Sequence, residues 1–90
     1  MTVKEFKMQY ALGALSNNSL QEIAKDPNTS KGILTILSSD EDHIIKSWIA
    51  SNPNTPIKIL TKLYEHGNNG LRWWISKNPG IKIVLEPVKT

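Results

Sequence analysis

The sequence predicts an all-α fold, a short helical-repeat solenoid of about three and a half units of about 26 residues each. Three prolines, Pro27, Pro53 and Pro79, are evenly spaced, each one full unit after the last. When residues 27–52 are aligned with residues 53–78 without a gap, ten of the 26 positions are identical. Apolar residues within each unit recur at the three- and four-residue spacing of an α-helix. Such a pattern is typical of proteins in which short helical units stack and share one core.

The length of 90 residues indicates a single domain over residues 1–90, since domains typically contain roughly 100–150 residues. The predicted units are residues 1–26, 27–52 and 53–78, followed by a truncated unit at 79–90. Hydrophobic residues make up 39% of the chain and charged residues 21%, a composition that excludes a disordered tail and a membrane protein. Cysteine is absent, which excludes disulfides and thiolate metal sites. With no apolar leader at its amino end, the chain is predicted to be cytoplasmic.

Each unit is predicted to contain two short helices. In the third unit, Ile59, Leu60 and Leu63 mark one apolar face of the first helix. In the first unit, helices are expected at about 3–15 and 19–25. Side chains that suit the N-cap of a helix precede the apolar stretches. The predicted caps are Thr2, Asn18, Thr29, Asp40 and Thr55, with Pro56 as the first helical residue.

The second helices carry tryptophans at equivalent positions, Trp48 in the second unit and Trp74 in the third. On a helical wheel, Trp48 falls within about 140° of arc with the apolar Ile45 and Ile49. The pattern therefore predicts that Trp48 and Trp74 form one buried column of the core. Replacing either by alanine is then expected to cost roughly 3–5 kcal/mol of the free energy of unfolding.

The turn between units carries a family resemblance. Residues Asn52 to Pro56 read Asn-Pro-Asn-Thr-Pro and are followed by an Ile-x-Ile-Leu-x-x-Leu segment, and Lys46 and Arg72 occupy a basic position in the second helices. Over residues 18–85 this pattern resembles the variant leucine-rich repeat family, with a slightly longer period. The resemblance implies alternating α- and 3₁₀-like helices in a right-handed superhelix related to HEAT and armadillo solenoids. It implies no particular activity.

No catalytic or cofactor-binding motif is present. The strings Gly-x-x-x-x-Gly-Lys, Gly-x-Gly-x-x-Gly, His-Glu-x-x-His and Gly-x-Ser-x-Gly do not occur. His43 follows three acidic residues, but acids are favoured at a helix N-terminus, and no second histidine stands three or four residues away to form a zinc pair. His66 is predicted to be a solvent-facing loop residue. The sequence therefore predicts a non-enzymatic protein that needs no metal or cofactor.

The stretch 72–74, Arg-Trp-Trp, is the strongest candidate for a binding surface. Trp73 aligns with the polar Ser47 and Gln21, so it is predicted to face solvent. An exposed tryptophan beside an arginine is typical of a protein-binding hot spot. Alternatively, Trp73 packs under the C-terminal segment 81–88. The predicted partner-binding residues, all on one face of successive second helices opposite the buried columns, are His43, Lys46, Asn69, Arg72 and Trp73.

Two classes of function fit this pattern. The first is a module that binds another protein, as a small bacterial or phage adaptor or stoichiometric inhibitor. The alternative is a solenoid that binds the nucleic-acid backbone, which the net charge of +3 and the lysines at 46, 58, 62, 77 and 82 favour. Eight interspersed acids and a single arginine, the side chain best suited to phosphate, argue against the alternative. Richness in lysine, asparagine and isoleucine indicates an AT-rich bacterium or its phage.

The C-terminal segment is predicted to cover the exposed end of the last repeat unit or to form a dimer contact there. Stacked units leave an open end unless a capping unit covers it. The apolar residues Ile81, Ile83, Val84 and Leu85 are therefore expected either to fold over the last unit or to pair two chains, which would give a monomer or a weak homodimer.

The predicted caps and helical periodicity lead to a first test of the fold. Far-UV circular dichroism is expected to show a mainly helical protein, because both helices of each unit carry apolar faces at the helical period. A spectrum dominated by β-sheet would contradict the repeat interpretation.

Overall fold

The computed structural model describes residues 1–79, and within this range the chain is all helical, with six α-helices and no strand. The sequence prediction of an all-α protein is confirmed. The expectation for Ile81, Ile83, Val84 and Leu85 concerns residues outside the described range. The helices are α1 (Val3–Ala11), α2 (Asn17–Lys25), α3 (Lys31–Leu37), α4 (His43–Ser51), α5 (Ile57–His66) and α6 (Asn69–Ser76).

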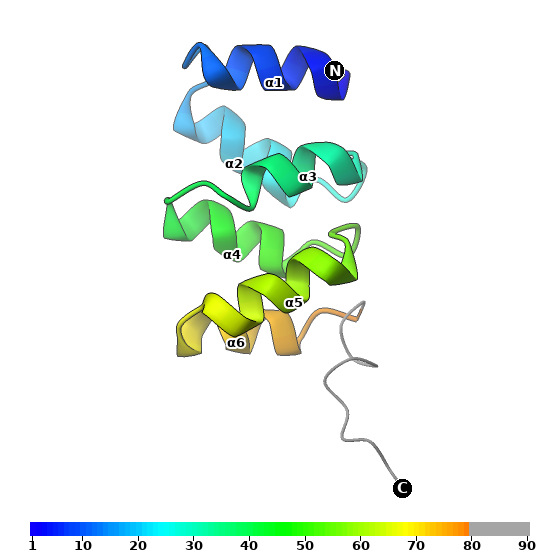
Figure 1. Cartoon of the computed structure of the whole chain (residues 1–90), viewed down its shortest axis with the longest axis vertical. Helices are drawn as coiled ribbons and strands as arrows, with labels where there is room; N and C mark the ends of the chain where they lie inside the picture. The colour runs from blue at the N-terminus through cyan, green and yellow to red at the C-terminus, as the bar shows by residue number, and fades with distance from the viewer. Residues whose placement is uncertain (80–90) are drawn as a thin grey trace, which may run out of the picture.

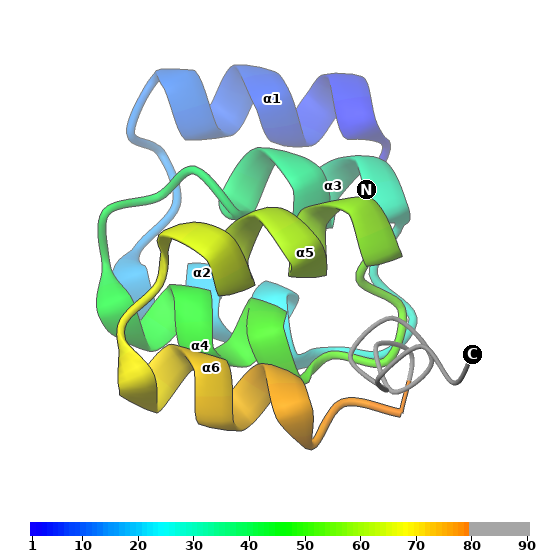
Figure 2. The same ribbon diagram turned by 60° about the horizontal axis from the view of Figure 1, so that its bottom comes forward.

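The helices are arranged in two rows (Figure 1). Figure 2 shows α1, α3 and α5 following one another in one row and α2, α4 and α6 in the other. Helix α4 packs on α2, α6 packs on α4, and α1 packs on α3. The buried apolar side chains lie between the two rows, where each short helix hides its apolar face against its neighbours because it cannot do so alone. They are Phe6, Leu20, Ala24, Ile33, Leu34, Leu37, Ile45, Ile49, Ala50, Leu60, Leu63 and Ile75.

Helix α1 begins as predicted but ends earlier. Thr2 and Glu5 form a reciprocal capping box, in which each side chain accepts from the other residue's backbone N–H. The sequence predicts a helix that reaches residue 15, whereas α1 ends at Ala11. Gly13 adopts a φ of 69°, which the missing Cβ makes inexpensive. The N–H groups of Gly13 and Ala14 donate to the carbonyls of Tyr10 and Gln9, so a Schellman motif terminates the helix.

The threonines of the two inter-unit turns are not N-caps, contrary to the prediction. Thr29 Oγ1 donates to Ile23 O at 2.7 Å, and Thr55 Oγ1 donates to Ile49 O at 2.8 Å. Each hydroxyl therefore satisfies a carbonyl near the end of the helix before the turn rather than an N–H of the helix after it. Ser30 is the N-cap of α3, so the cap lies one residue beyond the predicted position.

Three other predicted helix starts also shift by one or two residues. Helix α2 is capped by Ser16 rather than Asn18, and α4 by Asp42 rather than Asp40. Pro56 is the N-cap of α5 rather than its first helical residue, and it supplies no side-chain hydrogen bond. Asp42 accepts from the N–H groups of Ile44 and Ile45 and from Asn17 Nδ2. These hydrogen bonds, with that from Asn17 the strongest influence, lower the pKa of Asp42.

Two buried asparagines, Asn52 and Asn78, each form side-chain hydrogen bonds to the preceding inter-helix turn. Asn52 Nδ2 donates to Ala24 O at 2.8 Å and to Asp26 O at 2.9 Å. Asn78 Nδ2 donates to Ala50 O and Asn52 O at the same two distances. Both asparagines are 2% exposed, so these amides replace water at carbonyls that helix ends leave without an intrahelical partner.

The prediction that Trp48 and Trp74 form the core is wrong. Trp48 is 36% exposed and Trp74 is 43% exposed, whereas Ile49 and Ile75 beside them are fully buried. The buried residues of α4 are Ile45, Ile49 and Ala50, so the buried stripe extends from positions 45 and 49 towards position 50. Tryptophan at position 48 lies on the other edge of that stripe, so the buried arc is narrower than the helical wheel predicts.

A side-chain contact ties α1 to the α3–α4 loop. Tyr10 Oη donates to Asp40 Oδ2 at 2.5 Å, and the Tyr10 ring stacks on Phe6 with centroids 5.5 Å apart. Burial of the tyrosine, together with the hydrogen bond to Asp40, raises the pKa of Tyr10 to about 12. A carboxylate acceptor makes this bond one of the stronger kind.

Removing the buried amide tests the role of the asparagines. Asn52→Ala is expected to lower the free energy of unfolding by about 2–4 kcal/mol, because the buried Ala24 carbonyl loses its donor and Asp26 O keeps only the N–H of Thr29. Asn18→Ala serves as the matched control, since Asn18 is exposed, and its change is expected to stay within about 0.5 kcal/mol. Urea unfolding followed by circular dichroism measures both, and equal losses would contradict the structural role of Asn52.

Alkaline pH tests the contact of Tyr10 with Asp40. The pKa of Tyr10 in the folded protein lies above the ordinary tyrosine value of 10.0, so its contribution to stability is complete below about pH 10 and is lost as the pH rises towards 12. The advantage of the native protein over Tyr10→Phe in urea unfolding is therefore expected to shrink across that range. A constant difference between the two proteins from neutral pH to pH 12 would show that the contact does not contribute.

Candidate interaction surfaces

The second row of helices exposes a cluster of large apolar side chains. Ile44 and Trp48 lie one turn apart on α4, with exposed fractions of 55% and 36%. Trp74 occupies on α6 the position that Trp48 occupies on α4, and Trp73 beside it is 54% exposed. We call these four residues, Ile44, Trp48, Trp73 and Trp74, the tryptophan face. Exposed apolar side chains that lie beside one another, as Ile44 and Trp48 do on α4 and Trp73 and Trp74 do on α6, mark binding surfaces more often than scattered ones.

The rings of the tryptophan face are held by specific neighbours. Lys25 Nζ lies 5.4 Å from the centroid of Trp48, whose Nε1 donates a long hydrogen bond to Gln21 Oε1 at 3.4 Å. Trp73 meets Trp74 edge to face with centroids 5.0 Å apart, and Lys77 Nζ lies 5.6 Å from the Trp73 ring. Fixed rings lose little conformational entropy when a partner binds, which favours affinity.

An open groove of about 590 Å³ runs beside Trp48. One wall is the Trp48 ring, and the other is the first inter-unit turn with Pro27 and Thr29. Glu22, Lys25 and Asp26 contribute charges to its rim. The groove therefore combines an aromatic wall with a polar rim, the arrangement typical of surfaces that receive a side chain of a partner.

The five residues predicted to bind a partner divide into separate places. His43 and Lys46 line the same hollow between α4, α5 and the start of α6. Arg72 turns towards α5, where Nε donates to Tyr64 O at 2.9 Å and the guanidinium lies 5.2 Å from the Tyr64 ring. Trp73 belongs to the tryptophan face, and Asn69 is the exposed first residue of α6. The structure therefore brings His43 and Lys46 together beside the start of α6, while the Arg72 side chain contacts α5.

Helical periodicity does not reveal two members of the tryptophan face, because it assigns Trp48 and Trp74 to the core. A signal is present in the first unit, where Glu22 occupies the position equivalent to Trp48. A column that begins with a carboxylate is not a buried column, since an unpaired buried charge is costly. Glu22 is exposed and pairs with Lys25 at 3.0 Å.

Metal and membrane sites are not found in the described part of the chain. Among residues 1–79 no three His, Cys, Asp or Glu side chains are grouped so that they hold a metal ion. Over the same residues, none of the helices has both the length and the apolar character needed to cross a bilayer. Comparison of the chain with protein-family models, curated proteins and solved structures found no match.

Alanine substitutions distinguish the core from the tryptophan face. Ile75→Ala removes a fully buried side chain and is expected to cost about 2–5 kcal/mol of the free energy of unfolding. Trp73→Ala and Trp74→Ala are expected to cost only about 1–2 kcal/mol, because about half of each ring already faces solvent. Denaturant unfolding ranks the three variants, and a loss at Trp74 as large as that at Ile75 would mean that α6 is rotated.

Proposed function

We propose that this chain is a short right-handed helical-repeat solenoid that binds another protein through the tryptophan face. The repeat is supported by hydrogen bonds that recur one unit apart, from Asn52 and Asn78 and from Thr29 and Thr55. The same spacing appears in the turn motif that resembles the variant leucine-rich repeat family. Solenoids present extended surfaces across successive units, and binding is their usual use.

The observation that supports protein binding is the exposure of three tryptophans on two stacked helices. Tryptophan is enriched at the energetic centres of protein interfaces, where it buries a large area with few rotatable bonds. Ile44 adds aliphatic area beside Trp48. A polar rim, with Lys25, Glu22 and Gln21 around Trp48, matches the usual layout of such interfaces.

Several cations that would serve a nucleic-acid backbone already have protein partners. The only arginine, Arg72, bonds to Tyr64 of α5, and Lys31 Nζ donates to Asn54 Oδ1. Lys25 pairs with Glu22. Because a phosphate backbone is bound mainly through free cations, these contacts leave fewer cations for the nucleic-acid alternative, with Lys46 and Lys62 among those of the described range that form no salt bridge.

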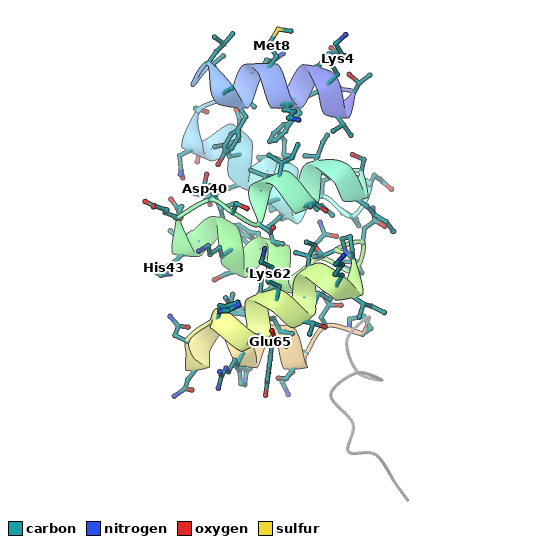
Figure 3. The ribbon with its side chains drawn as sticks, viewed as in Figure 1. Lys4, Met8, Asp40, His43, Lys62 and Glu65 are labelled. Atoms are coloured by element: carbon teal, nitrogen blue, oxygen red, sulfur yellow. The ribbon has the colours of Figure 1, made fainter. Side chains whose placement is uncertain are left out.

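Affinity capture with matched variants tests the proposal. The tagged chain, Trp48→Ala, Trp73→Ala and the control Met8→Ala are compared, each first shown to be folded by circular dichroism. Met8 is 58% exposed and points away from the other helices on α1 (Figure 3), so its truncation removes apolar surface at the opposite end of the molecule. A bound protein is expected to be retained by the native chain and Met8→Ala and lost from both tryptophan variants, with each change costing about 2 kcal/mol of binding free energy.

The same experiment separates the two classes of partner. Capture is repeated after nuclease treatment and over a range of salt concentrations. Protein binding is expected to survive nuclease and to change little with salt, whereas phosphate-backbone binding would fall steeply with salt and survive Trp73→Ala. Equal recovery of the partner by all four proteins would contradict binding at the tryptophan face.

A further inference from the structure

Basic side chains from two helices gather around hollows at the junction of α4, α5 and α6. A hollow of about 230 Å³ is lined by His43, Lys46 and His66. An adjoining hollow of about 220 Å³ is lined by Lys46, His66 and Lys62. We call these four residues, His43, Lys46, Lys62 and His66, the basic cluster. It includes none of the four residues of the tryptophan face, although His43 and Lys46 line a further hollow together with Trp74.

The spacing of these residues explains why they meet. His43 and Lys46 are three residues apart on α4, and Lys62 and His66 are four residues apart on α5, so each pair shares one helix face. Figure 3 shows Lys62 extending from α5 towards α4, and Glu65 pointing the opposite way. Gly67 permits the tight turn into α6, because a Cβ there would lie 2.5 Å from Leu63 O.

In the described part of the chain, the side chains of the basic cluster make no salt bridge, and the one acid that acts on them electrostatically is Asp42, whose pKa the adjacent His43 helps to lower. No carboxylate lines either hollow. Within residues 1–79, no side chain of the cluster makes an ion pair or a hydrogen bond. Of the neighbouring acids in the α3–α4 loop, Asp40 is bonded to Tyr10 and to the N–H of Asp42, and Asp42 caps α4. Glu41 is exposed.

Additional neutral donors surround the same space. Ser39, just after the end of α3, lines the hollow that contains Lys62, whereas the Ser38 hydroxyl beside it already donates to Thr35 O. Asn68, the N-cap of α6, lines the hollow that contains His43. The first turn of a helix presents backbone N–H groups without intrahelical acceptors, and these favour an anion in addition to the ammonium groups. Together the hollows offer donors without acidic acceptors.

We propose that the basic cluster binds a phosphate-class oxyanion, with Lys46 at its centre. Lys46 is half-buried and lines both hollows, so one oxyanion between them is reached from α4 and α5 at once. Ammonium and imidazole N–H donors form charge-assisted hydrogen bonds to phosphate oxygens. The hollows are smaller than those that receive drug-sized ligands, which suits an ion or the phosphate of a monoester.

Titration with inorganic phosphate tests the proposal. The probe is sodium phosphate, followed by NMR on the folded native chain against sodium chloride at matched ionic strength and constant pH. The signals of His43, Lys46, Lys62 and His66 are expected to shift saturably with phosphate only. Absence of saturable shifts up to the highest phosphate concentration, or the same shifts with chloride, would overturn the proposal.

Charge-removing variants locate the site. Lys46→Gln and Lys62→Gln are each expected to weaken phosphate binding about tenfold, since each removes one charge-assisted hydrogen bond. Lys58→Gln is the matched control, because Lys58 is an exposed lysine of the same helix α5 that lines neither hollow. Equal weakening by Lys58→Gln would show a general charge effect and overturn the proposal.

A second titration distinguishes the two sources of the same chemistry. O-phosphoserine replaces inorganic phosphate under the same conditions. Tighter binding of O-phosphoserine would support a phosphomonoester as the ligand, and equal or weaker binding would support free phosphate. In both cases Lys46→Gln is expected to weaken binding. If Lys46→Gln left the binding of either compound unchanged, the oxyanion would bind elsewhere and the proposal would be overturned. Trp73→Ala is expected to leave the titration unchanged, so this test fails or succeeds separately from protein binding at the tryptophan face.

Discussion

The buried amides of Asn52 and Asn78 fix the positions of successive inter-helix turns. Each amide reaches across to two carbonyls of the preceding turn, one near the end of a helix and one in the turn itself. Short helices leave several carbonyls without intrahelical partners at their ends, and burial makes an unsatisfied carbonyl costly. The position of each turn is therefore fixed relative to the one before it, and the helices that leave the turn inherit that position.

The same hydrogen bonds explain why the second-row helices lie against one another. With the turns fixed, α4 packs on α2 and α6 packs on α4, and the small side chain of Ala50 on α4 is fully buried. The edge of α4 opposite Ala50 is less tightly covered and accommodates a large side chain. Trp48 occupies this edge against Lys25 and Gln21 of α2, where its ring stays partly exposed. The tryptophan face is thus a product of the stacking rather than a part of the core.

The two surfaces differ in chemistry and in origin. The tryptophan face is apolar with a polar rim and lies on second-row helices alone. The basic cluster needs both rows, since His43 and Lys46 come from α4 and Lys62 and His66 from α5. Burying aromatic area and pairing phosphate charge are separate contributions to binding, and different side chains supply them here. The two surfaces adjoin where Trp74 lines a hollow with His43 and Lys46.

The helical class, the capping box at Thr2 and Glu5, and the apolar spacing that buries Leu60 and Leu63 all follow from the amino-acid sequence. These features are local, because they depend on helical periodicity and on contacts within one turn. The roles of Thr55 and Asn52 emerge only from tertiary packing, since their partners lie six residues away and 26–28 residues away rather than in the following helix. Packing also sets which edge of each helix is covered, and hence the exposure of Trp48 and Trp74 and the meeting of Lys46 with Lys62. A helical wheel gives the direction of each side chain, but only the neighbouring helix determines which directions are closed to water.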